Sequence, residues 1–279
     1  MNRMILRFFV LFVFAFPNSG VAAKAAAIAA ASDSVIRIGL NEITLDYDGL
    51  SRSVIFHLPS SYPQGESSPV VFAFHGMGGT NQGWPEHLRI LIDSSGYIGI
   101  YPQGIQRSWN SGSGMEPSKA DDVGFVEAIL DWLEGRVAID QNRVYAIGTS
   151  NGAALCHRLG LESDRFAAIA AIAATLLEGP VFDANIPKLS VLQIHGELDR
   201  VVPYGGGLSE SLGISFESAR NTVELWARHN GCDRRPEIEI IPGNISVYRY
   251  NGCDSSREVL LYSLKNAGHG ILRNTAGGL

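Results

Sequence analysis

The sequence predicts an α/β fold, with a mostly parallel sheet that is covered by helices on both faces. Short apolar runs of strand length alternate with segments of helical composition, and this alternation is typical of strand–helix–strand units. Uninterrupted apolar runs also indicate strands that are buried on both faces. The expected strands are 53–58, 69–74, 99–101, 144–147, 168–173, 190–195 and 259–264, and the expected helices are 121–134, 153–161 and 218–229.

Length and charge narrow the domain organisation and the possible partners. The 279 residues, 46% of them hydrophobic, can bury one full core but leave no room for a second folded domain. We therefore expect a single domain over 35–279. The net charge of −6 is not offset by a basic cluster, which argues against nucleic acid as a partner.

The start of the chain has the composition of an exported protein. Arg3 and Arg7 precede a short apolar stretch that ends at Pro17, and small residues follow it. This order predicts a signal peptide at 1–23 and a flexible, alanine-rich segment at 24–34. Because the apolar stretch is too short to span a bilayer comfortably, we expect a secreted protein, extracellular or periplasmic, without a stable membrane anchor.

A serine lies at a sharp strand-to-helix turn. Gly148-Thr149-Ser150-Asn151-Gly152 follows an apolar strand and precedes a helical stretch. Glycines two places before and after the serine suit this turn, because a Cβ at either place would collide with the backbone. The pattern is that of a hydrolase nucleophile elbow, which exposes the serine oxygen beside free helical N–H groups. The alternative, a glycine-softened junction, needs neither an acid nor a histidine at later strand ends.

Both an acid and a histidine do follow later strands. Asp199 lies in the loop after one expected strand, where Glu197 is a competing carboxylate, and His269 lies in a glycine-flanked loop after the last expected strand. We predict that His269 is the base and that Asp199 orients it. The chain order Ser150, Asp199, His269 is that of an α/β-hydrolase.

A second part of the predicted site is the glycine-rich loop 75–80. A backbone N–H in this loop can approach a substrate carbonyl, and we predict Met77 as this donor, with Gly78 as the alternative. Together with the N–H of Asn151 it would form the oxyanion hole. We place His75 beside the substrate. The competing interpretation is a simple tight turn in which His75 braces the loop.

The remaining histidines do not indicate a metal site. No pair of histidines and carboxylates has a spacing such as His-Glu-x-x-His, so we expect neither a metal nor a cofactor. His195 ends a buried strand at the same edge of the sheet, where it either lines the site or forms a local hydrogen bond. The histidines interpreted as structural are His57, His87, His157 and His229.

Because export is predicted, the cysteines of this chain can form disulfides. Cys232 and Cys253 lie in matching Asn-Gly-Cys-Asp contexts, whereas Cys156 lies in the helix after the elbow. We predict a disulfide between Cys232 and Cys253 and a buried free thiol at Cys156. Three unpaired thiols are the alternative.

Six motifs follow one another in a specific order. They are 70–80, Tyr-Pro-Gln-Gly at 101–104, Trp-Asn at 109–110, Asp-Asp-Val-Gly-Phe at 121–125, 143–152 and 226–232. Together they resemble the secreted polyhydroxybutyrate depolymerase and feruloyl esterase family over about 43–269. The resemblance implies an extracellular serine esterase on an α/β-hydrolase fold, with Ser150, Asp199 and His269 as its triad and an oxyanion role near Met77.

The resemblance also bears on the substrate. It places Trp109 along the substrate cleft, although this side chain could equally cover the edge of the core. It implies an ester from plant cell-wall polysaccharide or from a polyester, with a hydroxycinnamoyl, acetyl or hydroxyalkanoyl group. Two features depart from the family: Gly270 follows His269 where relatives have Trp-Pro, and the chain ends ten residues after His269, where a final helix is usual.

Three functions agree with these observations, and one is favoured. A serine ester hydrolase that forms an acyl-enzyme on Ser150 accounts for the triad order and for both oxyanion elements. A serine peptidase on the same fold is the second, but no additional domain is present to select peptides. A catalytically inactive, secreted carbohydrate- or polymer-binding protein is the third.

Overall fold

The structure is a computed structural model that describes residues 29–30, 36–62 and 66–270. The predicted signal peptide and the segment after Gly270 lie outside these residues, as does most of the predicted flexible start. Within the described residues, no helix is both long and apolar enough to cross a bilayer.

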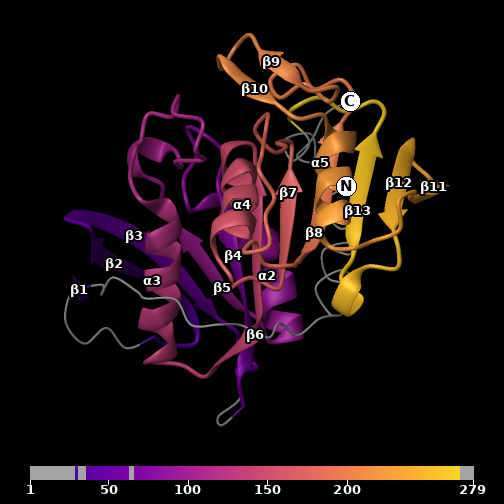
Figure 1. Cartoon of the computed structure of the whole chain (residues 1–279). Coiled ribbons are helices and arrows are strands. Elements are labelled where there is room, and N and C mark those ends of the chain that lie inside the picture. Colours follow the sequence, from indigo (N-terminus) through magenta and orange to yellow (C-terminus); the bar gives the residue numbers. More distant parts are fainter. Residues whose placement is uncertain (1–28, 31–35, 63–65, 271–279) are drawn as a thin grey trace.

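One eleven-stranded sheet runs through the described part of the chain (Figure 1). Its strands, in sheet order, are β1 Ala29–Ala30, β2 Gly39–Tyr47, β3 Leu50–Leu58, β5 Ile98–Pro102, β4 Ser68–Phe74, β6 Ile139–Thr149, β7 Ala168–Ile172, β8 Ser190–Gly196, β13 Val259–Leu264, β12 Ile245–Tyr250 and β11 Glu237–Ile241. Neighbouring strands from β5 to β13 pair in parallel, whereas β1 to β3 and β12 to β11 are antiparallel additions at the two edges. The predicted α/β-hydrolase fold is confirmed.

Helices cover both faces of this sheet (Figure 1). They are α2 Gly83–Ser95, α3 Asp122–Glu134, α4 Asn151–Glu162 and α5 Ala219–His229. Successive side chains of a strand point to opposite faces. Phe72 and Phe74 of β4 accordingly join a core cluster with α3, α4 and α5, whereas Val71 and Ala73 join a second cluster with α2. Apolar side chains on both faces explain why the central strands read as uninterrupted apolar runs.

A small hairpin lies beyond the carboxyl ends of the parallel strands (Figure 1). Its strands are β9 Gly207–Ser209 and β10 Ile214–Phe216. Phe216 packs with Val202 and Ala154 in a third, smaller apolar cluster, and Leu212 and Ile214 pack against it. The hairpin therefore covers the N-terminal end of α4.

A disulfide joins Cys232, which follows α5, to Cys253, which follows β12, as predicted. The two matching Asn-Gly-Cys-Asp segments also pair through their backbones: the N–H of Asp233 donates to Asn251 at 2.8 Å, and that of Asp254 donates to Asn230 at 2.9 Å. The cross-link thus fastens the last core helix to the antiparallel edge of the sheet.

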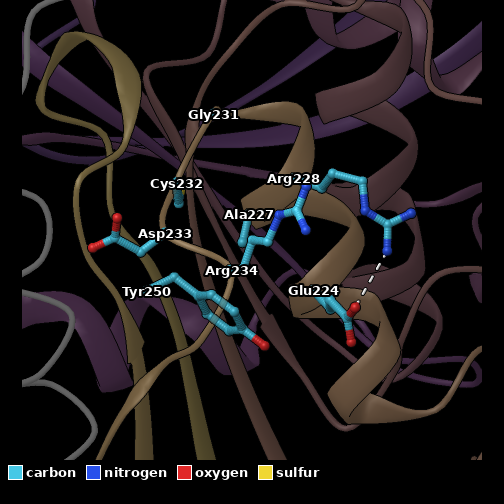
Figure 2. A pocket seen from close by; sticks show the side chains of 8 residues that line it. All are labelled: Glu224, Ala227, Arg228, Gly231, Cys232, Asp233, Arg234 and Tyr250. Atoms are coloured by element: carbon cyan, nitrogen blue, oxygen red, sulfur yellow. Dashed lines mark hydrogen bonds and ion pairs between the residues drawn. The ribbon is translucent and has the colours of Figure 1, made fainter.

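A surface hollow lies beside this cross-link. Figure 2 shows Cys232 and Tyr250 at the hollow, together with the ion pair that Arg228 and Glu224 form at 3.2 Å.

The third cysteine, Cys156, is a free thiol buried in α4. Burial raises the pKa of this thiol well above its usual range, so the thiol stays protonated at neutral pH.

Candidate active site

Ser150 occupies a strained turn between β6 and α4. Its φ of 53° and ψ of −124° fall in a region that residues other than glycine rarely adopt. A Cβ at Gly148 would lie 2.2 Å from the carbonyl oxygen of Gly152, and a Cβ at Gly152 would lie 2.4 Å from that of Phe74. Both glycines are therefore required by close backbone contacts, as the sequence pattern indicates.

The structure brings Ser150, Asp199 and His269 together at the carboxyl ends of β6, β8 and β13. Nε2 of His269 lies 2.9 Å from Oγ of Ser150, and Nδ1 lies 2.8 Å from Oδ2 of Asp199. The competing carboxylate, Glu197, instead accepts a hydrogen bond from Ser263 at 2.6 Å. Three side chains that are distant in the sequence thus form one continuous hydrogen-bonded series.

Asp199 is held as a buried anion. The backbone N–H groups of Val201 and Val202 each donate to Oδ1 at 2.9 Å. Burial alone raises the pKa of Asp199, but the hydrogen bonds from His195 and His269 outweigh burial and hold the pKa well below its usual range. The ionised carboxylate accepts the Nδ1 proton of His269, which leaves Nε2 able to accept the proton of the serine.

Two backbone donors border the same pocket as Ser150. Met77 and Asn151 both line this pocket, and their N–H groups form no hydrogen bond with another described residue. The N–H of Gly78, the alternative donor, is already committed to the carbonyl of Arg107 at 2.8 Å. The geometry therefore favours Met77 over Gly78 beside Asn151.

His75 and Trp109 do not line this pocket, and the expectation that they contact the substrate is corrected. Trp109 is fully buried, and its indole N–H donates to the carbonyl of His75 at 2.8 Å. His75 is also buried; its Nε2 accepts from the N–H of Gly104 at 3.1 Å, and its Nδ1 faces the carbonyl of Gly76 at 2.9 Å. Both rings join neighbouring loops, which matches the alternatives weighed for them.

The side chain of Asn151 has a role that the sequence did not indicate. Its Oδ1 accepts from the N–H of Trp109 at 2.7 Å, and its Nδ2 donates to the carbonyl of Trp109 at 2.9 Å. This reciprocal pair fastens the first residue of α4 to the loop after β5. The backbone N–H of Asn151 is thereby held in place at the elbow.

The pocket beside Ser150 is mostly apolar. Its lining residues are Met77, Ser111, Glu116, Ser150, Asn151, Ala154, Ala174, Val202, Leu212, Ile214 and Phe216. The β9–β10 hairpin supplies Leu212, Ile214 and Phe216, and the loop after β5 supplies Ser111 and Glu116. Neither segment has a periodic pattern from which a pocket could be predicted. Within the described residues, no group of three or more histidine, cysteine or carboxylate side chains could hold a metal ion.

Sequence comparison assigns the family. The model of the phospholipase/carboxylesterase family matches residues 61–211, which is more than half of the chain. The chain belongs to this family. It is a carboxylic-ester hydrolase, and the sequence-based recognition of an esterase family of α/β-hydrolases is confirmed.

Curated relatives of this esterase cover most of the chain. NocK, an inferred esterase of Nocardia uniformis subsp. tsuyamanensis, is 29% identical over 243 residues, which are 79% of this chain and 71% of that protein. Feruloyl esterase B of Piromyces equi is 28% identical over 231 residues, 78% of this chain but only 42% of that protein. Feruloyl esterase D of Neurospora crassa is 25% identical over 277 residues, 93% of this chain and 87% of that protein.

Solved structures agree with the fold of this esterase. An acetyl xylan esterase from Aspergillus awamori superposes with a TM-score of 0.58 at 15% identity, over 83% of this chain and 94% of that structure. A thermostable esterase superposes with a TM-score of 0.52 at 19% identity, over 68% of this chain and 52% of that structure. At such identities the likeness concerns the fold alone.

Proposed function

We propose that this esterase is a serine hydrolase that forms an acyl-enzyme on Ser150. The observation that carries the proposal is the position of His269, which lies within hydrogen-bond distance of both Ser150 and Asp199. A positioned base beside a hydroxyl on a strained elbow is the arrangement that activates a serine nucleophile.

In the first half of the reaction, the ester acylates the enzyme. Nε2 of His269 accepts the hydroxyl proton of Ser150 as the serine oxygen attacks the ester carbonyl carbon. The oxyanion that forms is stabilised by the N–H groups of Met77 and Asn151. The protonated imidazole then gives its proton to the leaving alkoxide, so that an alcohol departs and the acyl group stays on Ser150.

In the second half, water replaces the alcohol. His269 accepts a proton from water as the water oxygen attacks the acyl carbon, and the same two N–H groups receive the second oxyanion. The proton then returns to the oxygen of Ser150, which releases the carboxylic acid. Asp199 remains ionised throughout and stabilises the imidazolium that forms in each half.

The proposed substrates are esters of plant cell-wall polysaccharides, with a feruloyl esterase type of activity. The names of the relatives from Piromyces equi and Neurospora crassa support this substrate class. The second candidate, which the sequence motifs support, is hydrolysis of a polyester of the polyhydroxybutyrate depolymerase type. The predicted signal peptide and the disulfide support secretion of the enzyme.

A pair of measurements tests the proposal. The wild type should react with a fluorophosphonate probe at Ser150 and hydrolyse methyl ferulate, acetylated xylan or hydroxybutyrate oligomers, whereas Ser150→Ala should lose both properties and keep its thermal unfolding temperature. Ester hydrolysis retained by Ser150→Ala would refute the assignment. Cleavage of peptide anilides faster than esters would favour the peptidase, and an unlabelled serine would favour an inactive binding protein.

A further inference from the structure

The pocket beside Ser150 contains a carboxylate with one unpaired oxygen. Glu116 is 4% exposed. Its Oε1 accepts hydrogen bonds from the N–H of Ser111 at 3.0 Å, from the N–H of Ser113 at 3.1 Å, and from the hydroxyl of Ser111. Its Oε2 is buried and accepts a hydrogen bond from no described residue. All of the satisfied contacts therefore converge on one oxygen.

This side chain carries a negative charge. Burial raises the pKa of Glu116, but the hydrogen bonds from Ser111 and Ser113 outweigh burial and hold the pKa below its usual value. No arginine, lysine or histidine of the described residues forms an ion pair with it. A buried carboxylate oxygen without a donor is unfavourable, and a molecule that brings a donor to it gains a charge-assisted hydrogen bond.

The location of Glu116 identifies the molecule that could bring this donor. Glu116 lines the same pocket as Ser150, Met77 and Asn151, so an ester bound for attack by Ser150 also occupies the space that Glu116 borders. The other lining residues around it are chiefly apolar, so Glu116 and Ser111 are the polar groups of this pocket outside the proposed catalytic groups.

We propose that Glu116 is a substrate-binding residue that selects esters carrying a hydroxyl group. The inference rests on the proposed serine esterase function and adds a chemical requirement to it. A hydroxyl group needs one acceptor for its proton, which Oε2 supplies, whereas an ammonium group would need three acceptors that this apolar pocket does not offer. The hydroxyl can belong to the acyl group or to the alcohol, and the experiment distinguishes the two.

Matched ester pairs test the inference. On the acyl side, methyl p-coumarate is compared with methyl cinnamate, and methyl 3-hydroxybutyrate with methyl butyrate. On the alcohol side, 2-hydroxyethyl butyrate is compared with propyl butyrate. We expect the wild type to prefer the hydroxylated member of at least one pair, and Glu116→Gln to lower kcat/KM for that member by about tenfold or more. The unhydroxylated member should change by less than about twofold, because it offers no donor to lose.

Two controls separate recognition from folding. Glu116→Gln keeps an acceptor for the three donors that meet at Oε1 but can present an amide donor in place of Oε2. Glu239→Gln makes the same chemical change at an exposed position on the edge strand β11, outside the pocket, and it should leave the selectivity for every pair unchanged. Thermal unfolding of both variants checks that neither is misfolded.

The outcomes are distinguishable from failure of the proposed function. A wild type that cleaves the esters without preference in any pair would overturn the inference, as would equal losses for both members in Glu116→Gln. A wild type that cleaves none of the esters would instead refute the serine esterase. In that case calorimetric binding of the hydroxylated esters to Ser150→Ala, with and without Glu116→Gln, decides the role of Glu116: equal binding by both variants rejects it.

Discussion

Trp226 donates its indole N–H to Nδ1 of His157 across 3.3 Å. Because an indole nitrogen can only donate, this contact assigns the proton of His157 to Nε2. That nitrogen faces Oε1 of Gln193 at 3.0 Å, so the amide nitrogen of Gln193 is left to donate to Nδ1 of His195 at 3.2 Å. One tryptophan on α5 thereby fixes the proton positions of two buried histidines.

The series ends at the carboxylate of the proposed triad. With Nδ1 accepting from Gln193, His195 carries its proton on Nε2, which faces the carbonyl of Val202 at 3.0 Å and Oδ2 of Asp199 at 3.4 Å. Oδ2 is also the oxygen that contacts His269. The Nε2 proton of His195 therefore lies between the carbonyl of Val202 and Oδ2 of Asp199, and we expect His195 to act as a positioning residue for the acid.

The role of His195 is tested by a pair of substitutions. His195→Leu removes the donor, so the pKa of Asp199 should rise and the carboxylate should be oriented less well towards His269; kcat should fall about tenfold with little change in KM. His195→Gln keeps an amide donor at a similar position and should restore most of the loss. An equal loss of kcat in His195→Leu and His195→Gln would reduce His195 to a packing role.

His157 should make the fold sensitive to acid. Burial lowers the pKa of His157 from 6.5 to about 4. Between these two values the unfolded chain binds a proton that the folded chain excludes, so folding stability that is present above pH 6.5 is lost as the pH falls towards 4. The loss amounts to about 3 kcal/mol. Urea unfolding at several pH values measures it, and His157→Gln should give a shallower dependence on pH. An unchanged slope in His157→Gln would contradict this assignment.

The elbow glycines should tolerate no side chain. Gly152→Ala places a Cβ against the backbone oxygens of Phe74 and His75, which should lower ester hydrolysis about a hundredfold or more and destabilise the fold by about 1–3 kcal/mol. Gly83, the first residue of α2, has no atom within 4 Å of an added Cβ, so Gly83→Ala is the matched control. Kinetics and thermal unfolding of the two variants should differ accordingly; similar behaviour would argue against a steric requirement at the elbow.

Removal of the disulfide should lower stability without abolishing activity. The Cys232–Cys253 bond closes a segment with a sequence separation of 21, and cross-links of this size stabilise a fold by about 3 kcal/mol. The double variant Cys232→Ser/Cys253→Ser should unfold at lower urea concentration and retain kcat, because the bond does not contact the pocket beside Ser150. Cys156→Ser, which removes the free thiol, is the comparison. If it lowered stability as much as the double variant does, the loss would come from replacing cysteine side chains by serine and not from breaking the cross-link.

Most of the central fold could be predicted because its signals are local. The strands β4, β8 and β13 and the second half of β6 are mostly apolar runs, and each is followed by a loop in which glycines and a polar residue mark the strand end. The elbow around Ser150 is specified by two glycines at fixed spacing. Since parallel strands end at the same edge of a sheet, the convergence of Asp199 and His269 on Ser150 followed from the order of the elements.

The parts that escaped prediction depend on tertiary contacts. β9 and β10 have three residues each, too few for any periodicity, and β11 is an exposed edge strand. Trp109 is compatible with a cleft wall or a core edge until its neighbours are known. Glu116 lies in an irregular loop, where no sequence pattern separates a buried carboxylate from an exposed one.

The strand β7 stands between β6, which carries Ser150, and β8, which leads to Asp199. The N–H of Ser150 donates to Ile172 at 2.8 Å, and the N–H of Ala173 donates to Ile194 at 2.9 Å, so this narrow strand sets the spacing between nucleophile and acid. If β7 shifted its register, Ser150 and Asp199 would lose their relative positions even though the loop that carries each of them kept its own conformation. The catalytic rate would then fall before unfolding of the protein could be detected by spectroscopy.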